Sequence, residues 1–373
     1  MANIFDYLKW RGDLTFTKAP LNPVDALVFS ALSYVRYGGS AESAPRVPVP
    51  LKKAAEEFFV LEDYESRSRV LKDLDLLHAA ASTVRFGNCG ICFCRDQLIP
   101  EQETQFAAMT FLLDDGSMFL AFRGTDNSLV GWKEDFNMTF QQTIPAQRMA
   151  LQYTREAALE YGCPIYMGGH SKGGNLAVFA AARSSPMIQQ RIQAVYNNDG
   201  PGFTGYLMGD PGYLSMVPRI HTYIPQSSVI GMLLEHEEPY TVIRSKSVGI
   251  LQHDLYTWEV MGREFLPVEN ISEGSQFMDA TIKAWFADMS NQDRNQLVDV
   301  MFALLGSGGA DSIQSLIQPK NIRTYIKTLS SDENLRRVLS TEFQSLMEAA
   351  RKTKARLDGS REALPGAEEE QPR

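Results

Sequence analysis

The chain has 373 residues, of which 44% are hydrophobic and 22% charged, a balance typical of a globular protein with a sizeable core. Its formal net charge of −9 at pH 7 argues against nucleic acid or an anionic membrane as a general partner, because an acidic surface repels both. No apolar run of about eighteen residues occurs, so no transmembrane segment is expected. Residues 1–10 lack a basic stretch followed by an apolar run, which predicts no signal peptide and a cytoplasmic location.

Residues 1–80 are expected to form a helical segment that packs on the core. Apolar residues recur at intervals of three and four in two stretches, 24–37 and 52–77, and Asn22-Pro23 opens the first of them. This periodicity is typical of amphipathic helices. We therefore predict two long helices before the first strand.

Residues 81–267 alternate between short apolar runs and helical patterns. Asp115-Gly116 between two apolar runs is typical of a hairpin. Strands joined by helices predict a mostly parallel central sheet with covered faces, which is the outline of an α/β-hydrolase core. The expected strands are 88–95, 104–113, 118–122, 164–168, 193–197, 220–224 and 240–245, and the expected helices are 145–161 and 175–183.

Residues 268–356 carry helical patterns alone and predict a helical extension, interrupted by the sequence Gly-Ser-Gly-Gly at 306–309. Residues 357–373 are rich in Glu, Pro and Gly, which predicts a disordered tail. The helices expected in the extension are 279–289, 292–305, 312–316 and 332–355.

The four cysteines do not form a disulfide framework in a chain of this length. Cys89, Cys92 and Cys94 form a C-x-x-C-x-C cluster, and Cys163 stands alone. A structural zinc site needs four ligands, and no nearby Cys or His completes the set. We therefore expect buried strand cysteines and no metal.

The sequence Gly-His-Ser-Lys-Gly at 169–173 has the form G-x-S-x-G and is followed by Gly174. An apolar strand is expected before it and a helix of small residues after it, as in a nucleophile elbow. Such an elbow turns so sharply that the neighbours of the serine must be small, and the turn lifts the hydroxyl above the sheet. The alternative is a glycine-rich turn with a capping serine. The flanking elements favour Ser171 as a nucleophile.

A serine nucleophile needs a base, and the chain has five histidines. His170 lies inside the elbow and should point away from a substrate, whereas His78 and His221 lie in an expected helix and an expected strand. The order along an α/β-hydrolase chain is serine, acid, then histidine in a late loop. His253 fits this order best, and His236, in an acidic loop, is the alternative.

The acid that would orient the histidine is less sharply defined. Asp199 directly follows an expected strand and lies between Ser171 and His253, so it could orient the imidazole and stabilise its charged form. Asp-Gly-Pro-Gly is also ordinary turn chemistry. Glu235 and Glu237, after the next strand, remain alternatives.

The oxyanion formed during acyl transfer needs two donors. The first is expected to be the backbone N–H of Lys172, the residue after the nucleophile. The second should come from the loop after an early strand, where Thr125 could offer both its N–H and its hydroxyl. The alternative is a turn that holds an ion pair between Arg123 and Asp126.

Three separated motifs resemble the class 3 (fungal-type) lipases. They are Phe-Arg-Gly-Thr at 122–125, Gly-Trp-Lys-Glu-Asp at 131–135 and Gly-His-Ser-Lys-Gly-Gly-Asn at 169–175. The similarity is closer to an uncharacterised bacterial lipase-like family, through the elbow lysine, Asn-Asp-Gly-Pro-Gly-Phe at 198–203 and Gln-His-Asp at 252–254. It covers roughly residues 1–265. The resemblance implies an α/β-hydrolase fold with Ser171 as nucleophile, His253 as base and Thr125 in the oxyanion hole.

The chain departs from the class 3 pattern at the acid. Those lipases carry it after the strand that is expected here at 220–224, and the segment 225–228 has no carboxylate. Asp199 lies one strand earlier, where pancreatic-type lipases carry theirs. The resemblance therefore leaves the choice between Asp199 and Glu235 or Glu237 open.

The expected activity is that of a serine-dependent carboxylic-ester hydrolase, which forms an acyl-enzyme and needs no cofactor or metal. Its substrate would be a small-molecule or lipid ester. A thioesterase or acyltransferase would use the same residues. A catalytically silent binding protein is the alternative from another class, because a fold alone does not determine function.

Overall fold

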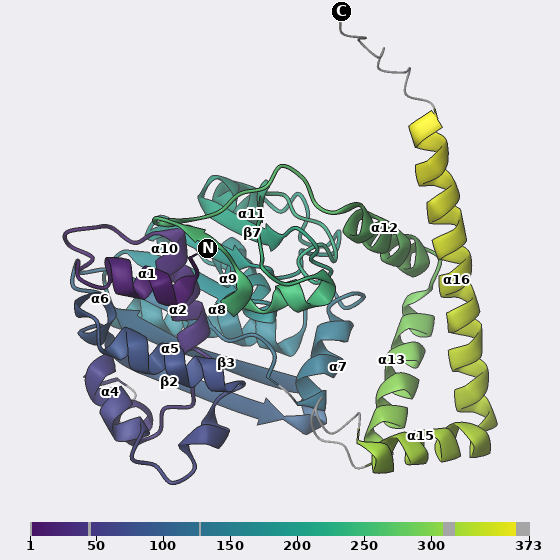
Figure 1. Cartoon of the computed structure of the whole chain (residues 1–373), viewed down its shortest axis with the longest axis horizontal. Helices are drawn as coiled ribbons and strands as arrows, with labels where there is room; N and C mark the ends of the chain where they lie inside the picture. Colours follow the sequence, from purple (N-terminus) through teal and green to yellow (C-terminus); the bar gives the residue numbers. More distant parts are fainter. Residues whose placement is uncertain (1, 44–45, 127, 309–317, 363–373) are drawn as a thin grey trace, which may run out of the picture.

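The computed structural model describes residues 2–43, 46–126, 128–308 and 318–362. Its centre is an eight-stranded sheet whose strands lie side by side in chain order (Figure 1). The pairs from the first to the fourth strand are antiparallel, and the pairs from the fourth to the eighth strand are parallel. The strands are β1 Val49–Pro50, β2 Gly90–Ile99, β3 Thr104–Leu112, β4 Met118–Phe122, β5 Ile165–His170, β6 Ile192–Asn198, β7 Ile220–Pro225 and β8 Tyr240–Ile243, with a separate pair β9 Val260–Met261 and β10 Glu264–Phe265.

The expected hairpin is present between β3 and β4, where Leu112 pairs with Met118 and Gly116 has a φ of 81°. In β2 the register shifts between Cys92 and Arg95, and Phe93 between them has a φ of 57°, which is the geometry of a bulge. The parallel strands β4 to β7 are joined by helices, and a loop without a helix joins β7 to β8. The chain therefore has the predicted α/β-hydrolase fold with a mostly parallel central sheet.

Helices of the N-terminal segment cover one face of the sheet. They are α1 Ile4–Arg11, α2 Pro23–Leu32, α3 Gly39–Ser43, α4 Leu51–Phe58, α5 Leu71–Ala81 and α6 Val84–Gly87. Helix α2 packs on β5, β4 and β6, and its residues from Val24 onward are buried. A buried ion pair, Arg85 Nη2 to Asp25 Oδ2 at 2.5 Å, ties α6 to α2, and Tyr7 of α1 donates a hydrogen bond to the same carboxylate.

Two predicted helices of this segment are shorter than expected. The helix expected at 24–37 ends at Leu32, and the stretch 52–77 is broken into α4, a 3₁₀ turn at Tyr64–Arg67 and α5. Ser66 and Ser68 in the interruption donate their hydroxyls to backbone carbonyls. Such local hydrogen bonds compete with helix formation, which accounts for the break.

The opposite face of the sheet is covered by α8 Pro145–Glu160 and α9 Lys172–Arg183, which pack on each other. Every residue of α9 except Arg183 is buried, because its glycines and alanines let the helix lie close to β5 and β6. One hydrophobic cluster fills the side of the N-terminal helices and a second fills the side of α8 and α9. The shorter helices near this face are α7 Leu129–Asn137, α10 Pro186–Gln189 and α11 Pro211–Met216.

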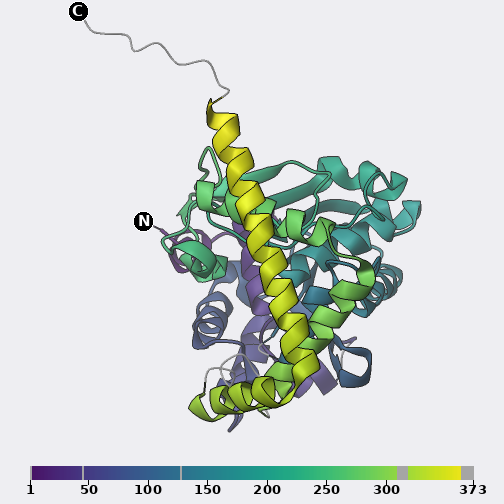
Figure 2. The same cartoon turned by 90° about the vertical axis from the view of Figure 1, so that its right-hand side faces the viewer.

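The C-terminal helices stand beside this body, and the long α16 runs along their outer side (Figures 1 and 2). They are α12 Glu273–Ala287, α13 Asn291–Gly306, α15 Pro319–Ser331 and α16 Glu333–Glu362. The helix expected at 312–316 lies outside the described residues, and α15 was not predicted. The tail expected from residue 357 overlaps α16, which continues to Glu362. No helix in the described ranges is long and apolar enough to cross a membrane.

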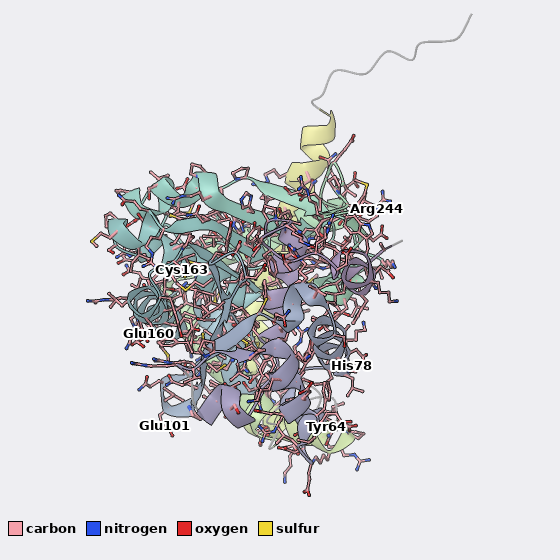
Figure 3. All side chains as sticks on the ribbon, turned by 90° about the vertical axis from the view of Figure 1, so that its left-hand side faces the viewer. Tyr64, His78, Glu101, Glu160, Cys163 and Arg244 are labelled. Carbon is pink, nitrogen blue, oxygen red and sulfur yellow. The ribbon has the colours of Figure 1, made fainter. Side chains whose placement is uncertain are left out.

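The cysteines are free thiols. Cys89 and Cys92 are buried, Cys94 is half-buried, and Cys163 lies between α8 and β5 on the side of the molecule seen in Figure 3. Burial raises the pKa of the Cys92 thiol to about 11 and that of Cys94 to about 12. Both thiols are therefore protonated at neutral pH and act as small apolar side chains.

Candidate active site

Ser171 stands at the turn between β5, which ends at His170, and α9, which begins at Lys172. Its backbone angles, a φ of 59° and a ψ of −135°, lie outside the regions that residues other than glycine usually adopt. Two hydrogen bonds hold this conformation, from Ser171 N to Asn198 O at 2.9 Å and from Gly174 N to Ser171 O at 2.9 Å. The backbone thus has the strand–turn–helix form of a nucleophile elbow.

The glycines of the elbow leave no room for side chains. A Cβ on Gly173 would lie 2.1 Å from the carbonyl oxygen of Phe122, and one on Gly169 would lie 2.3 Å from the carbonyl carbon of Gly173. Backbone atoms of β4 therefore press directly against the turn. The small residues that suggested an elbow are required by this close approach.

We expect Gly173→Val to destabilise the fold, because the clash is with backbone and no side chain can move aside. Overpacking of this kind costs about 1–3 kcal/mol or more, which lowers the melting temperature by several degrees in a thermal unfolding experiment. Gly162→Val is the matched control, since a Cβ at Gly162 meets nothing within 4 Å. Equal melting temperatures for the two variants would contradict the close packing of the elbow.

Asp199 and His253 meet beside this elbow. Asp199 directly follows β6 with a φ of 55° and is fully buried. Its Oδ2 lies 2.7 Å from Nδ1 of His253, which sits at the end of a 3₁₀ turn, Gly249–His253. An Nδ1–H that donates to the carboxylate leaves Nε2 free to accept a proton.

The second oxygen of Asp199 is also bonded. Ser228, in the turn after β7, donates its hydroxyl to Asp199 Oδ1 at 2.5 Å and accepts the N–H of Gly231. The class 3 pattern implies an acid in this turn. Here the turn has a serine instead, and that serine holds the carboxylate contributed by the preceding strand.

The alternative residues lie elsewhere. His236 faces Glu238 Oε1 at 3.1 Å and the carbonyl oxygen of Gly231 at 2.9 Å. Glu235 pairs with Lys283 at 3.4 Å, and its side chain is 62% exposed. Glu237 accepts a hydrogen bond from the backbone of Gly209. Of the three carboxylates considered, only Asp199 contacts His253.

His170 is fully buried, and its ring lies 4.5 Å from the ring of His253. Burial and the neighbouring His253 hold the pKa of His170 well below its ordinary value, so the ring is neutral. Its Nε2 lies 2.9 Å from the backbone oxygen of His253 and its Nδ1 3.0 Å from the hydroxyl of Tyr34. A neutral ring can satisfy both contacts by donating from Nε2 and accepting at Nδ1. His170 thereby fixes the position of the His253 loop, a role that the sequence did not suggest.

Lys172 joins the elbow to α7. Its ammonium, 1% exposed, lies 2.9 Å from Glu134 Oε2 and also donates to the backbone and side-chain oxygens of Gln105. The Glu134 carboxylate is fully buried and accepts the N–H of Ala146 as well. Buried charges require such pairing. This ion pair explains why a lysine can follow the nucleophile.

Thr125 lies in the loop that follows β4, and its hydroxyl donates a hydrogen bond to Asp135 Oδ2 at 2.5 Å. The proton of this hydroxyl is therefore engaged by the half-buried Asp135 carboxylate, and the oxyanion role of Thr125 stays a prediction. Burial raises the pKa of Asp135 to about 6, although the nearby Lys172 opposes the shift. The ion pair considered between Arg123 and Asp126 is also absent, since Arg123 bonds to Asp96 instead.

A cavity of about 430 Å³ opens at these residues, and Ser171, His253 and Thr125 line it. This volume lies within the range of small-molecule sites. Most of the remaining lining is apolar. It comes from Trp132 and Phe136 of α7, from the segment 229–234, and from Ile282, Trp285 and Phe286 of α12.

A profile of the Mbeg1-like family matches residues 80–303. The chain belongs to the Mbeg1-like family. The matched region contains Ser171, Asp199 and His253, and it extends beyond the sheet through α12 into α13.

This Mbeg1-like chain is similar to solved structures of lipases at low identity. The Rhizomucor miehei lipase propeptide complex is 14% identical, with 59% of this chain and 67% of that chain covered and a TM-score of 0.37. A mutant form of MDLA from Penicillium cyclopium is 11% identical, with 67% of this chain and 86% of that chain covered and a TM-score of 0.38. No curated protein sequence matches the chain significantly.

Proposed function

We propose that this Mbeg1-like protein is a serine-dependent carboxylic-ester hydrolase, with Ser171 as nucleophile, His253 as base and Asp199 as acid. The observation that carries the proposal is the 2.7 Å contact between Asp199 Oδ2 and His253 Nδ1. His253 lines a cavity that is also lined by Ser171, the residue at the turn of the elbow. A buried carboxylate on an imidazole, beside a serine at a strand–helix turn, is the arrangement that acyl transfer requires.

In the proposed reaction, Ser171 Oγ attacks the ester carbonyl while Nε2 of His253 takes its proton. The Asp199 carboxylate stabilises the imidazolium that forms. The backbone N–H groups of Lys172 and Thr125 would bind the oxyanion, and the N-terminus of α9 favours the same negative charge. His253 then gives the proton to the leaving alcohol, and water hydrolyses the acyl-enzyme by the reverse route.

The lining of the cavity supports an acyl group as the part of the substrate that is buried. Aromatic and aliphatic side chains from α7, the segment 229–234 and α12 surround the space next to Ser171. Burial of an aliphatic chain there is favourable at about 25 cal/mol per Å² of apolar surface. A fatty-acid ester therefore fits the cavity better than a highly charged ester.

His253→Ala should lower the rate of acyl-enzyme formation by about 10³ or more, since the serine loses its base. His236→Ala is the matched control and should stay near the wild-type rate, because His236 pairs with Glu238 and not with Asp199. Both rates can be measured with p-nitrophenyl butyrate under single-turnover conditions. The reverse ranking of the two variants would move the base to His236.

The activity itself is tested with purified protein and p-nitrophenyl esters from acetate to palmitate. We expect turnover and, where deacylation is slow, an initial burst of p-nitrophenol equal to the enzyme concentration. Esters that differ only in the leaving group should deacylate at one common rate. No hydrolysis of any ester above the buffer rate would contradict the proposal.

A further inference from the structure

We infer that α12 forms a wall of the acyl pocket and that Trp285 determines which acyl chains fit. The inference rests on the proposed function and specifies its substrate class, an ester whose aliphatic acyl chain is short enough to fit the cavity beside Ser171.

Three residues of α12 line the same cavity as Ser171 and His253. Ile282, Trp285 and Phe286 occupy positions i, i+3 and i+4, which places them on one face of the helix. The rings of Trp285 and Phe286 stack with their centroids 5.2 Å apart. This face presents large, apolar surface to the cavity, and such a wall limits the length of any chain that lies there.

The C-terminal helices attach to the body as a separate layer. In the described ranges, neither of the two main hydrophobic clusters includes a residue beyond Phe265. Helix α12 packs chiefly on α16, while α13 packs on α16 and α7. Helix α12 therefore belongs to a layer outside the core of the sheet (Figures 1 and 2).

Several contacts between described residues join this layer to the body, among them the exposed ion pair of Lys283 with Glu235. Phe302 of α13 meets Phe136 of α7 with ring centroids 5.8 Å apart. Lys133 pairs with Asp299 at 2.7 Å, and Asp299 is 67% exposed, so water screens the attraction. A layer held in this way can change the pocket without disturbing the elbow or the contact between Asp199 and His253.

The experiment compares kcat/KM for p-nitrophenyl palmitate and octanoate in the full-length protein. Trp285→Ala removes a large side chain from the cavity wall and makes room for a longer acyl chain. It should raise the palmitate-to-octanoate ratio of kcat/KM about tenfold or more, since each additional methylene bound in an apolar pocket stabilises the transition state. Met278→Ala is the control, because Met278 lies on the same helix, is 43% exposed and does not line the cavity. Its ratio should equal that of the wild type.

Labelling of Ser171 by a fluorophosphonate reports the site independently of chain length. The inference would be overturned if Trp285→Ala and Phe286→Ala both label normally and both keep the wild-type ratio of kcat/KM for palmitate and octanoate. That result would leave the proposed function standing. The second variant also covers a failure of the first to fold. If the wild-type protein neither reacts with the fluorophosphonate nor hydrolyses esters, the proposed function itself is contradicted.

Discussion

Replacement of Ser171 with alanine is expected to lower kcat for ester hydrolysis by about 10⁶, the loss that removal of a serine nucleophile causes in a triad. The reason is that no acyl-enzyme can form, and water must attack the bound ester directly. The remaining rate would come from the cavity and the oxyanion donors, which the substitution leaves in place. Steady-state hydrolysis of p-nitrophenyl butyrate measures the change.

The fold of this variant should be intact. The hydrogen bonds that hold the elbow involve the backbone of Ser171, and alanine tolerates the positive φ about as well as serine. Circular dichroism and the melting temperature should therefore match the wild type. A Ser171→Ala protein with wild-type turnover would place the nucleophile elsewhere.

Asp199→Asn is expected to lower kcat by about 10⁴, because asparagine stabilises the wrong imidazole tautomer. Its side-chain oxygen can still accept the hydroxyl of Ser228, which turns the amide toward Nδ1 of His253. The proton then resides on Nε2, and the ring can no longer accept a proton from Ser171. Hydrolysis rates near neutral pH measure the loss.

Glu235→Gln is the control for the acid, since Glu235 is exposed and pairs with Lys283. Its kcat should stay within a few-fold of the wild type. If Glu235→Gln or Glu237→Gln loses activity while Asp199→Asn keeps it, the acid is not Asp199.

The fold and the elbow could be predicted because their signals are local. Alternating strands and helices indicated the parallel sheet, and the glycines around Ser171 indicated a turn with no space for side chains. Chain order and spacing favoured His253 and placed Asp199 at a strand end, and the structure brings these two side chains into contact. The sequence could not show which of Asp199 and Glu235 contacts His253, because that contact depends on where the loop after β7 folds.

The supporting contacts could not be predicted, because they join residues far apart in the chain. Lys172 and Glu134 are separated by 38 positions, and His170 and His253 by 83. The sequence showed the helical periodicity of α12 but not the surface on which it packs. Which residues line the cavity beside Ser171 is set by the docking of α12, which no local pattern encodes.

The most direct measurement is covalent labelling with a fluorophosphonate, followed by mass spectrometry of the digested protein. This reagent reacts with a serine whose hydroxyl a neighbouring base activates. We expect one adduct per chain, on the peptide that contains Ser171, and no adduct in Ser171→Ala or His253→Ala. An unlabelled wild-type protein, or an adduct on another residue, would contradict the account.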